Sequence, residues 1–243
     1  MKKILLTAFI SLLMIQSTEA QWVGGGFGNF VTGPVYNISS ELRKELQSPQ
    51  LLGSDLQLNS PAIVFGGAGY SVRPRKIILG GSGYWYIVSS STNEGEVKFE
   101  SRAGFFNMGY RVIRKKNWFA FPYWGMGVSA MKFKITNQNP DKIFIFDTDS
   151  VRSNQNATYT TGGLGFEMGF AVKYLAFNTE EKNKHDKITG LVLGADGGIA
   201  VLPAFAKWHS NLSDSNISSL SKPFVISPYV RITLGFGVFY DKK

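Results

Sequence analysis

The chain has 243 residues, with 26 Lys or Arg against 17 Asp or Glu, 27 Gly, 19 Phe, 10 Tyr, 5 Trp and no Cys. The lack of cysteine excludes a disulfide scaffold, an iron–sulfur cluster, a cysteine-based zinc site and a lipoprotein anchor, and two histidines argue against a His-rich metal site. Charged residues make up 18% of the chain, less than in an average soluble domain, while glycine and aromatic residues are enriched.

The N-terminal segment has the features of an export signal. Lys2 and Lys3 precede an apolar stretch over residues 4–15, and Thr18-Glu19-Ala20 places small residues where a signal peptidase reads them. This stretch is too short to cross a bilayer as a helix. We therefore predict that residues 1–20 are cleaved and that 21–243 form one domain. The alternative is an anchor that is retained.

The rest of the sequence alternates in character along extended segments, as strands with two different faces do. Along 224–240, even positions are bulky and apolar, as at Phe236, whereas odd positions include several glycines and Arg231. Segments 163–174 and 190–201 show the same contrast.

This contrast indicates which way the apolar face points. In a soluble β-sandwich the face opposite the core lies in water and is rich in Lys, Glu, Thr and Ser. In a narrow barrel within a membrane, bulky residues face lipid and the lumen holds small residues and a few paired charges. The glycine-rich second face favours the membrane barrel.

The pattern predicts an all-β fold, an eight-stranded antiparallel up-and-down transmembrane β-barrel with a short helix in its first long loop. Its connections alternate between long and short, and in such barrels the short turns lie in the periplasm. The predicted strands are 22–31, 61–72, 76–89, 96–111, 118–135, 158–177, 187–205 and 223–240.

Two local features complicate this pattern. The apolar phase of the fourth segment changes at Phe105-Phe106, which predicts a β-bulge. Residues 142–146 (KIFIF) also form a strand-like segment, which we assign to a hairpin above the membrane. If this segment crosses the bilayer with a partner, the barrel has ten strands.

The first long connection contains a predicted helix over 39–47. Ser39 or Ser40 can cap it, Glu41 places a carboxylate near its N-terminus, and Leu42 and Leu46 form one apolar stripe. This helix can lie across the barrel mouth, plug it or decorate the surface, and the sequence leaves the three options open.

Aromatic residues near the strand ends predict two belts at the membrane–water interfaces. Trp85, Phe205 and Phe224 fall near the long loops, and a scattered aromatic core is the alternative. The girdle predicted at the short turns comprises Trp22, Tyr70, Tyr110, Trp118, Tyr174 and Tyr240.

Charged residues on the face assigned to the lumen predict an ion network. Antiparallel pairing places Asp196 near both Arg231 and Glu167, so a guanidinium between two carboxylates would offset charges that are costly to enclose. We favour a structural network over a solute or proton path, because eight strands leave room only for side chains. The predicted network comprises Lys98, Glu100, Arg102, Glu167, Lys173, Asp196 and Arg231.

Signals for catalysis are weak. His209 and Ser210, with Asp214 nearby, contain the residue types of a hydrolase triad, but a triad is defined by geometry and not by proximity in sequence. The glycine clusters are not followed by a helical pattern, as a phosphate-binding loop would be. We therefore expect a chain without enzymatic activity, cofactor or metal.

Basic residues concentrate at the short connections, where they predict a rim that attracts anionic headgroups or an anionic wall polymer in the periplasm. Nucleic-acid binding is the competing explanation for the basic charge, and export argues against it. The rim comprises Arg73, Arg75, Lys76, Arg111, Arg114, Lys115, Lys116, Lys182, Lys184, Lys187, Lys242 and Lys243.

With its export signal, eight alternating segments, glycine-lined face and aromatic strand ends, the chain resembles the small outer-membrane β-barrels of Gram-negative bacteria. This class contains OmpX, OmpW and the membrane domain of OmpA. Members often end on an aromatic residue, whereas here Asp241-Lys242-Lys243 follows Tyr240.

The resemblance implies a monomer in the bacterial outer membrane, in contact with its lipid and lipopolysaccharide. It also implies a structural, adhesive or surface-binding role through the long external loops. The alternatives are a channel for small solutes and a secreted, soluble, lipocalin-like binding protein.

Overall fold

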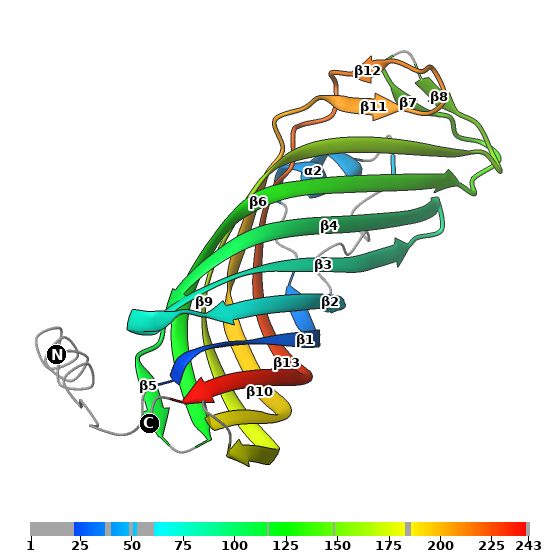
Figure 1. Ribbon diagram of the computed structural model, residues 1–243. Coiled ribbons are helices and arrows are strands. Elements are labelled where there is room, and N and C mark those ends of the chain that lie inside the picture. The colour runs from blue at the N-terminus through cyan, green and yellow to red at the C-terminus, as the bar shows by residue number, and fades with distance from the viewer. Residues whose placement is uncertain are drawn as a thin grey trace, which may run out of the picture.

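The computed structural model describes residues 22–36, 40–48, 51–52, 61–115, 117–147, 149–182 and 186–241. The predicted signal segment 1–20 lies outside the described residues. Eight long strands form the body of the protein (Figure 1): β1 (Trp22–Tyr36), β2 (Pro61–Val72), β3 (Ile77–Ser91), β4 (Gly95–Tyr110), β6 (Trp118–Asn137), β9 (Asn156–Lys182), β10 (Asp186–Pro203) and β13 (Phe224–Asp241).

The eight strands close into a barrel. Each long strand pairs antiparallel with the next in chain order, and β1 pairs with β13. Closure leaves no free edge along the barrel wall. The predicted eight-stranded antiparallel barrel is confirmed.

Short elements mark the two ends of the barrel. The short-turn end carries η1 (Pro74–Lys76) and β5 (Ile113–Lys115). The long-loop end carries α2 (Ser40–Leu46), β7 (Phe144–Phe146), β8 (Asp149–Val151), β11 (Trp208–Ser210) and β12 (Asn216–Ile217), which Figure 1 shows together. Among the described residues β7 pairs with β8 alone, so the segment 142–146 belongs to a hairpin and the barrel has eight strands, not ten.

Large apolar side chains point outward from the middle of the barrel wall. Met168, Ile232 and Phe236 are 71%, 67% and 73% exposed, whereas Glu167 and Arg231 are 3% and 1% exposed. The outward apolar run of β9, from residue 164 to residue 174, matches the length of a strand that crosses a bilayer. We call this band the apolar belt; its exposed members include Phe106, Trp124, Met126, Val128, Leu164, Phe166, Met168, Phe170, Ile232, Leu234 and Phe236.

The interior at the short-turn end is filled by aromatic rings rather than by small residues alone. Phe27 lies with its ring centroid 5.4 Å from that of Phe119 and 6.2 Å from that of Phe239, and Phe121 stacks on Phe119. All four rings are buried. The glycine-lined lumen predicted from the sequence is therefore only part of the interior, because glycines on some strands leave space that phenylalanines on others occupy.

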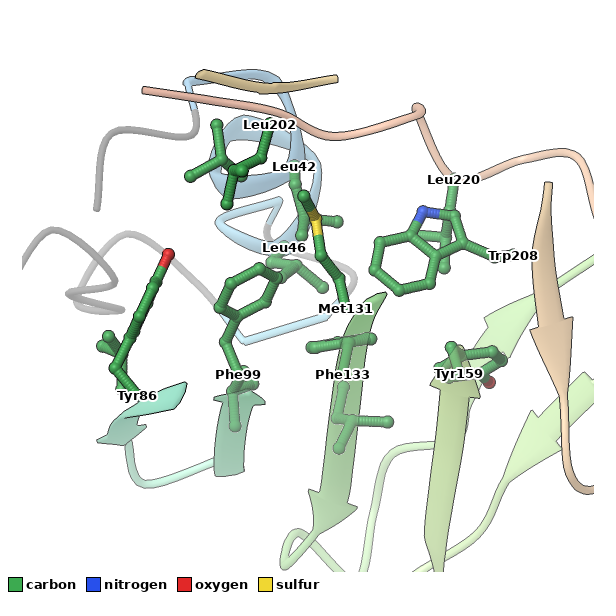
Figure 2. Packing of buried hydrophobic residues seen from close by; sticks show 14 of the residues in the cluster. Leu42, Leu46, Tyr86, Phe99, Met131, Phe133, Tyr159, Leu202, Trp208 and Leu220 are labelled. Atoms are coloured by element: carbon green, nitrogen blue, oxygen red, sulfur yellow. The ribbon is translucent and has the colours of Figure 1, made fainter. Parts of the chain in front are cut away.

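At the long-loop end the two faces of the strands exchange character. Phe99, Met131 and Phe133 point inward and are buried, while alternate residues of the same strands are charged and point outward. This inner face forms an apolar cluster with Tyr159 and Trp208. Figure 2 shows these side chains packed beneath α2. This part of the barrel is built like a soluble protein.

The helix α2 closes this cluster. Leu42 and Leu46 are 1% and 0% exposed and pack with Phe99 and Met131 (Figure 2). The carboxylate of Glu45 accepts a hydrogen bond of 2.9 Å from the backbone N–H of Ser221. Of the three predicted placements, the structure therefore shows the second: the helix plugs the barrel mouth and does not merely decorate the surface. Among the described residues, no helix has the length and apolarity needed to cross a membrane.

The phase of β4 does not change at Phe105-Phe106. Its register with β3 and β6 runs without a shift through these residues, so the predicted bulge is absent. Val97, Phe99 and Phe105 all point inward. The sequence suggests a phase change only because the inner face is apolar near the long loops and polar farther along.

The loops at the long-loop end are held together by Asp147. Its Oδ2 accepts backbone N–H hydrogen bonds from Ser218 and, at 2.9 Å, from Ser219. These donors favour the ionised carboxylate and hold the pKa of Asp147 below its ordinary value. The residue therefore connects the β7–β8 turn to the chain after β12.

This contact is expected to be sensitive to acid. A lowered folded pKa means that its stabilisation is present above the unfolded value of about 3.9 and is lost as pH falls through the folded pKa. Protection of the Ser218 and Ser219 amides from hydrogen exchange should therefore decrease toward pH 3. In Asp147→Ala it should already be low at pH 7. Equal protection in both proteins at both pH values would contradict this prediction.

Candidate functional site

Buried charges lie between the aromatic rings that fill the short-turn end and the apolar cluster at the long-loop end. Lys173 of β9 donates from Nζ to Asp196 Oδ1 of β10 at 2.5 Å and to Thr233 Oγ1 of β13 at 2.7 Å. Lys173 is 0% exposed and Asp196 is 3% exposed. A buried ion pair offsets its desolvation only when its remaining polar atoms are also hydrogen-bonded, and Thr233 provides one such bond.

Arg231 forms the second part of the network. Its Nη2 donates to Tyr123 Oη at 2.8 Å and lies 3.6 Å from Glu167 Oε2. Its guanidinium carbon lies 4.0 Å and 3.6 Å from the ring centroids of Tyr84 and Tyr229. A cation enclosed between two aromatic faces gains cation–π stabilisation away from water.

Polar side chains from distant strands surround Glu167. Its carboxylate accepts from Ser82 Oγ at 2.9 Å and from Tyr229 Oη at 3.4 Å, and Asn107 donates to Ser82 Oγ at 2.8 Å. The charged residues of this network are two cations, Lys173 and Arg231, and two carboxylates, Glu167 and Asp196, so their charges balance. The arrangement joins β3, β4, β6, β9, β10 and β13 and is suited to holding the barrel together.

The structure brings together four of the seven residues predicted for the network. Glu167, Lys173, Asp196 and Arg231 all lie inside. Asp196 stands opposite Arg231 in the β10–β13 register, but its ion pair is with Lys173. Several further polar residues of the interior belong to the network but not to the predicted set: Ser82, Tyr84, Asn107, Tyr123, Tyr229 and Thr233. Tyr229 and Thr233 were detectable, since each lies two residues from Arg231 and therefore shares its face of the strand.

Lys98, Glu100 and Arg102 were wrongly assigned to the lumen. They project from the outer surface of β4, where Lys98 and Arg102 are exposed. The prediction would hold only if the apolar face of β4 pointed outward along the whole strand. At the long-loop end the apolar face packs inward under α2, so the charged face meets water.

A small cavity separates Arg231 from the apolar cluster. Its volume is about 30 Å³, which is room for one or two water molecules. The buried Arg231 Nε at its wall has no hydrogen-bond partner among the residues that the structure describes.

The aromatic girdle predicted at the short turns is present only in part. Tyr110, Trp118 and Tyr240 are exposed on the outer surface, and Tyr174 lies 4.8 Å from Trp118 between ring centroids. Tyr70 is wrongly assigned, because its position in β2 shares the inward face with Val72 and its ring lies 5.1 Å from Phe27. The side chain of Trp22 lies outside the described part. Toward the long loops, Trp85, Phe205 and Phe224 are exposed.

His209, Ser210 and Asp214 do not form a catalytic arrangement. His209 Nε2 lies 3.2 Å from Asp214 Oδ1 on the surface, whereas Ser210 is buried and donates to the carboxylate of Asp149. Adjacent residues of a strand point to opposite faces, so His209 cannot activate Ser210 in this conformation. Within the described ranges, no three or more His, Asp or Glu side chains are grouped in a way that could hold a metal ion.

The basic rim at the short-turn end is described only in part. Arg73, Arg75 and Lys115 are exposed there, whereas Arg111 is buried. The structure does not describe the side chains of Lys116, Lys182, Lys184, Lys242 and Lys243.

Solved structures of small outer-membrane β-barrels are similar to this closed barrel. Similar solved structures include Ail, the attachment invasion locus protein of Yersinia pestis, at 10% identity and a TM-score of 0.43 over 90% of this chain and 99% of that one. Neisserial surface protein A has 10% identity and a TM-score of 0.35, over 92% and 99% of the chains. OprG from Pseudomonas aeruginosa has 14% identity and a TM-score of 0.35, over 91% and 97%.

No known protein family and no curated protein sequence matches the chain.

Proposed function

We propose that this chain is a monomeric outer-membrane protein whose barrel crosses the bilayer at the apolar belt. The apolar belt is the observation that supports this proposal. At the level of the belt, the charges of Glu167, Lys173, Asp196 and Arg231 lie inside the barrel, an arrangement that is stable in hydrocarbon and unfavourable in water. With the short turns in the periplasm, α2, β7, β8, β11 and β12 lie outside the cell.

The external end supports a structural, adhesive or surface-binding role rather than catalysis. It has its own apolar core, formed around Phe133, Tyr159 and Trp208, and its loops are joined by Asp147 and Glu45. Ordered loops on a rigid barrel present a fixed surface to a partner at a small entropic cost. The exposed part of the basic rim supports an anionic periplasmic partner.

Membrane location is tested by fractionating cells that express the full chain. We expect the protein in the outer-membrane fraction, with a faster mobility on SDS gels before heating than after it, because intact barrels resist unfolding in the detergent. Recovery in the soluble periplasmic fraction would instead support the lipocalin-like alternative.

Conductance in planar bilayers tests the channel alternative. We expect the inserted protein to show no stepwise ion current, because Phe27, Phe119, Phe121 and Phe239 fill one end of the lumen and α2 closes the other. A porin of roughly 16 strands, which leaves an aqueous channel, shows in the same bilayers that such currents are detectable. Steps of defined size from the native chain would support a solute channel instead.

A further inference from the structure

Beyond the apolar belt, the outer wall of the barrel becomes basic. On β4 the outward residues after Phe106 are Gly104, Arg102, Glu100 and Lys98. On β6 the run of Met126, Val128 and Ala130 gives way to Lys132 and Lys134. The facing residues of β9 are Thr160 and Thr158. We call Lys98, Arg102, Lys132 and Lys134, with these two threonines, the wall patch.

The strand register brings the wall patch into two adjoining rows. Lys98 stands directly opposite Lys134, which in turn stands opposite Thr158. Lys132 lies in the next row, with Glu100 on one side and Thr160 on the other. Directly opposed like charges destabilise a sheet. A ligand with concentrated negative charge would remove this repulsion.

The carboxylates in the patch leave its lysines available. Glu100 Oε1 accepts from Arg102 Nε at 2.6 Å and from Trp85 Nε1 at 2.9 Å. Glu96 stands opposite Thr136 and Ser91 at the far edge of the patch. None of the three lysines forms an ion pair with another described residue of the chain.

The position of the patch indicates the source of the anion. It continues directly from Phe106 and Val128, which are 54% and 66% exposed in the apolar belt, and Trp85 lies at the boundary. Tryptophan is enriched where hydrocarbon meets headgroups. An amphiphile whose chains lie against the belt would therefore place its headgroup at the lysines.

We propose that the wall patch binds the phosphate groups of a lipid headgroup in the external leaflet of the membrane. This inference rests on the proposed outer-membrane function and adds a ligand class and a site to it. Lysine ammonium groups bind phosphate as point charges, and threonine hydroxyls can donate to its remaining oxygens. The site lies on the outer wall and is independent of the loops.

The test compares lipid binding by matched triple variants. The full chain, folded in neutral detergent, is titrated with diphosphorylated lipid A, and bound lipid is counted by native mass spectrometry. K98Q/K132Q/K134Q should bind roughly 10- to 100-fold more weakly than the native chain. The control K44Q/K207Q/K222Q removes the same charge from exposed lysines elsewhere at the long-loop end and should stay within about twofold.

Two further probes identify the chemistry and its source. Dephosphorylated lipid A should bind the native chain and K98Q/K132Q/K134Q equally weakly, and inorganic phosphate at the same concentration should not compete. The proposal is overturned if both triple variants bind lipid A like the native chain, or if inorganic phosphate displaces it.

Fractionation and heat-dependent mobility of the same proteins report on the proposed function separately. If K98Q/K132Q/K134Q loses lipid binding but keeps its outer-membrane fractionation and its heat-dependent mobility, the loss is due to the wall patch alone. A native chain that fails both assays contradicts the membrane location itself.

Discussion

Replacing Arg231 with leucine is expected to lower the free energy of unfolding by about 3 kcal/mol or more. The change removes the cation from between Tyr84 and Tyr229, and it leaves Glu167 as a buried carboxylate with no facing guanidinium. Most of the loss comes from that uncompensated charge. Equilibrium unfolding by denaturant in lipid vesicles measures the effect.

The matched control is Arg102→Leu. Arg102 has a side chain that is 68% exposed and an ion pair with Glu100, so its loss should change the free energy of unfolding by less than about 1 kcal/mol. Adding Glu167→Gln to Arg231→Leu should restore part of the stability, because the remaining buried charge is then removed. If Arg231→Leu unfolds at the same denaturant concentration as the native chain, Arg231 is not central to the network.

Placing a charge in the apolar belt is expected to destabilise the barrel in a bilayer. Phe236 is 73% exposed and lies within the outward apolar run of β13, so Phe236→Arg should lower the free energy of unfolding from vesicles by about 2–4 kcal/mol. In a water-soluble protein, a substitution at so exposed a position would usually change stability by less than about 0.5 kcal/mol.

Ser91→Arg provides the comparison for Phe236→Arg. Ser91 is also exposed on the outer surface, but it lies beyond the belt and stands opposite Glu96 in the β3–β4 register, so its substitution should leave stability within about 0.5 kcal/mol. The difference between the two variants therefore reports contact with hydrocarbon. If both unfold like the native chain, the belt does not face lipid and the barrel is a soluble one.

Much of the fold could be predicted because its determinants are local. The alternation at Ile232 and Phe236 against Arg231 and Gly235 depends only on the two-residue period of a strand, so it identifies strands and their faces before any pairing is known. The predicted limits of β2, residues 61–72, match those observed. The helix stripe of Leu42 and Leu46 was likewise visible in the sequence.

The sequence by itself determined that the chain forms antiparallel strands with two different faces, and that Glu167 and Arg231 lie inside the barrel. Only the tertiary structure decided that Lys98, Glu100 and Arg102 point outward, because β4 extends beyond the belt and α2 covers its apolar face there. It also decided that Asp196 pairs with Lys173 rather than with Arg231 across the register. Strand length, barrel closure and side-chain reach decide these outcomes, and they depend on residues far apart in the chain.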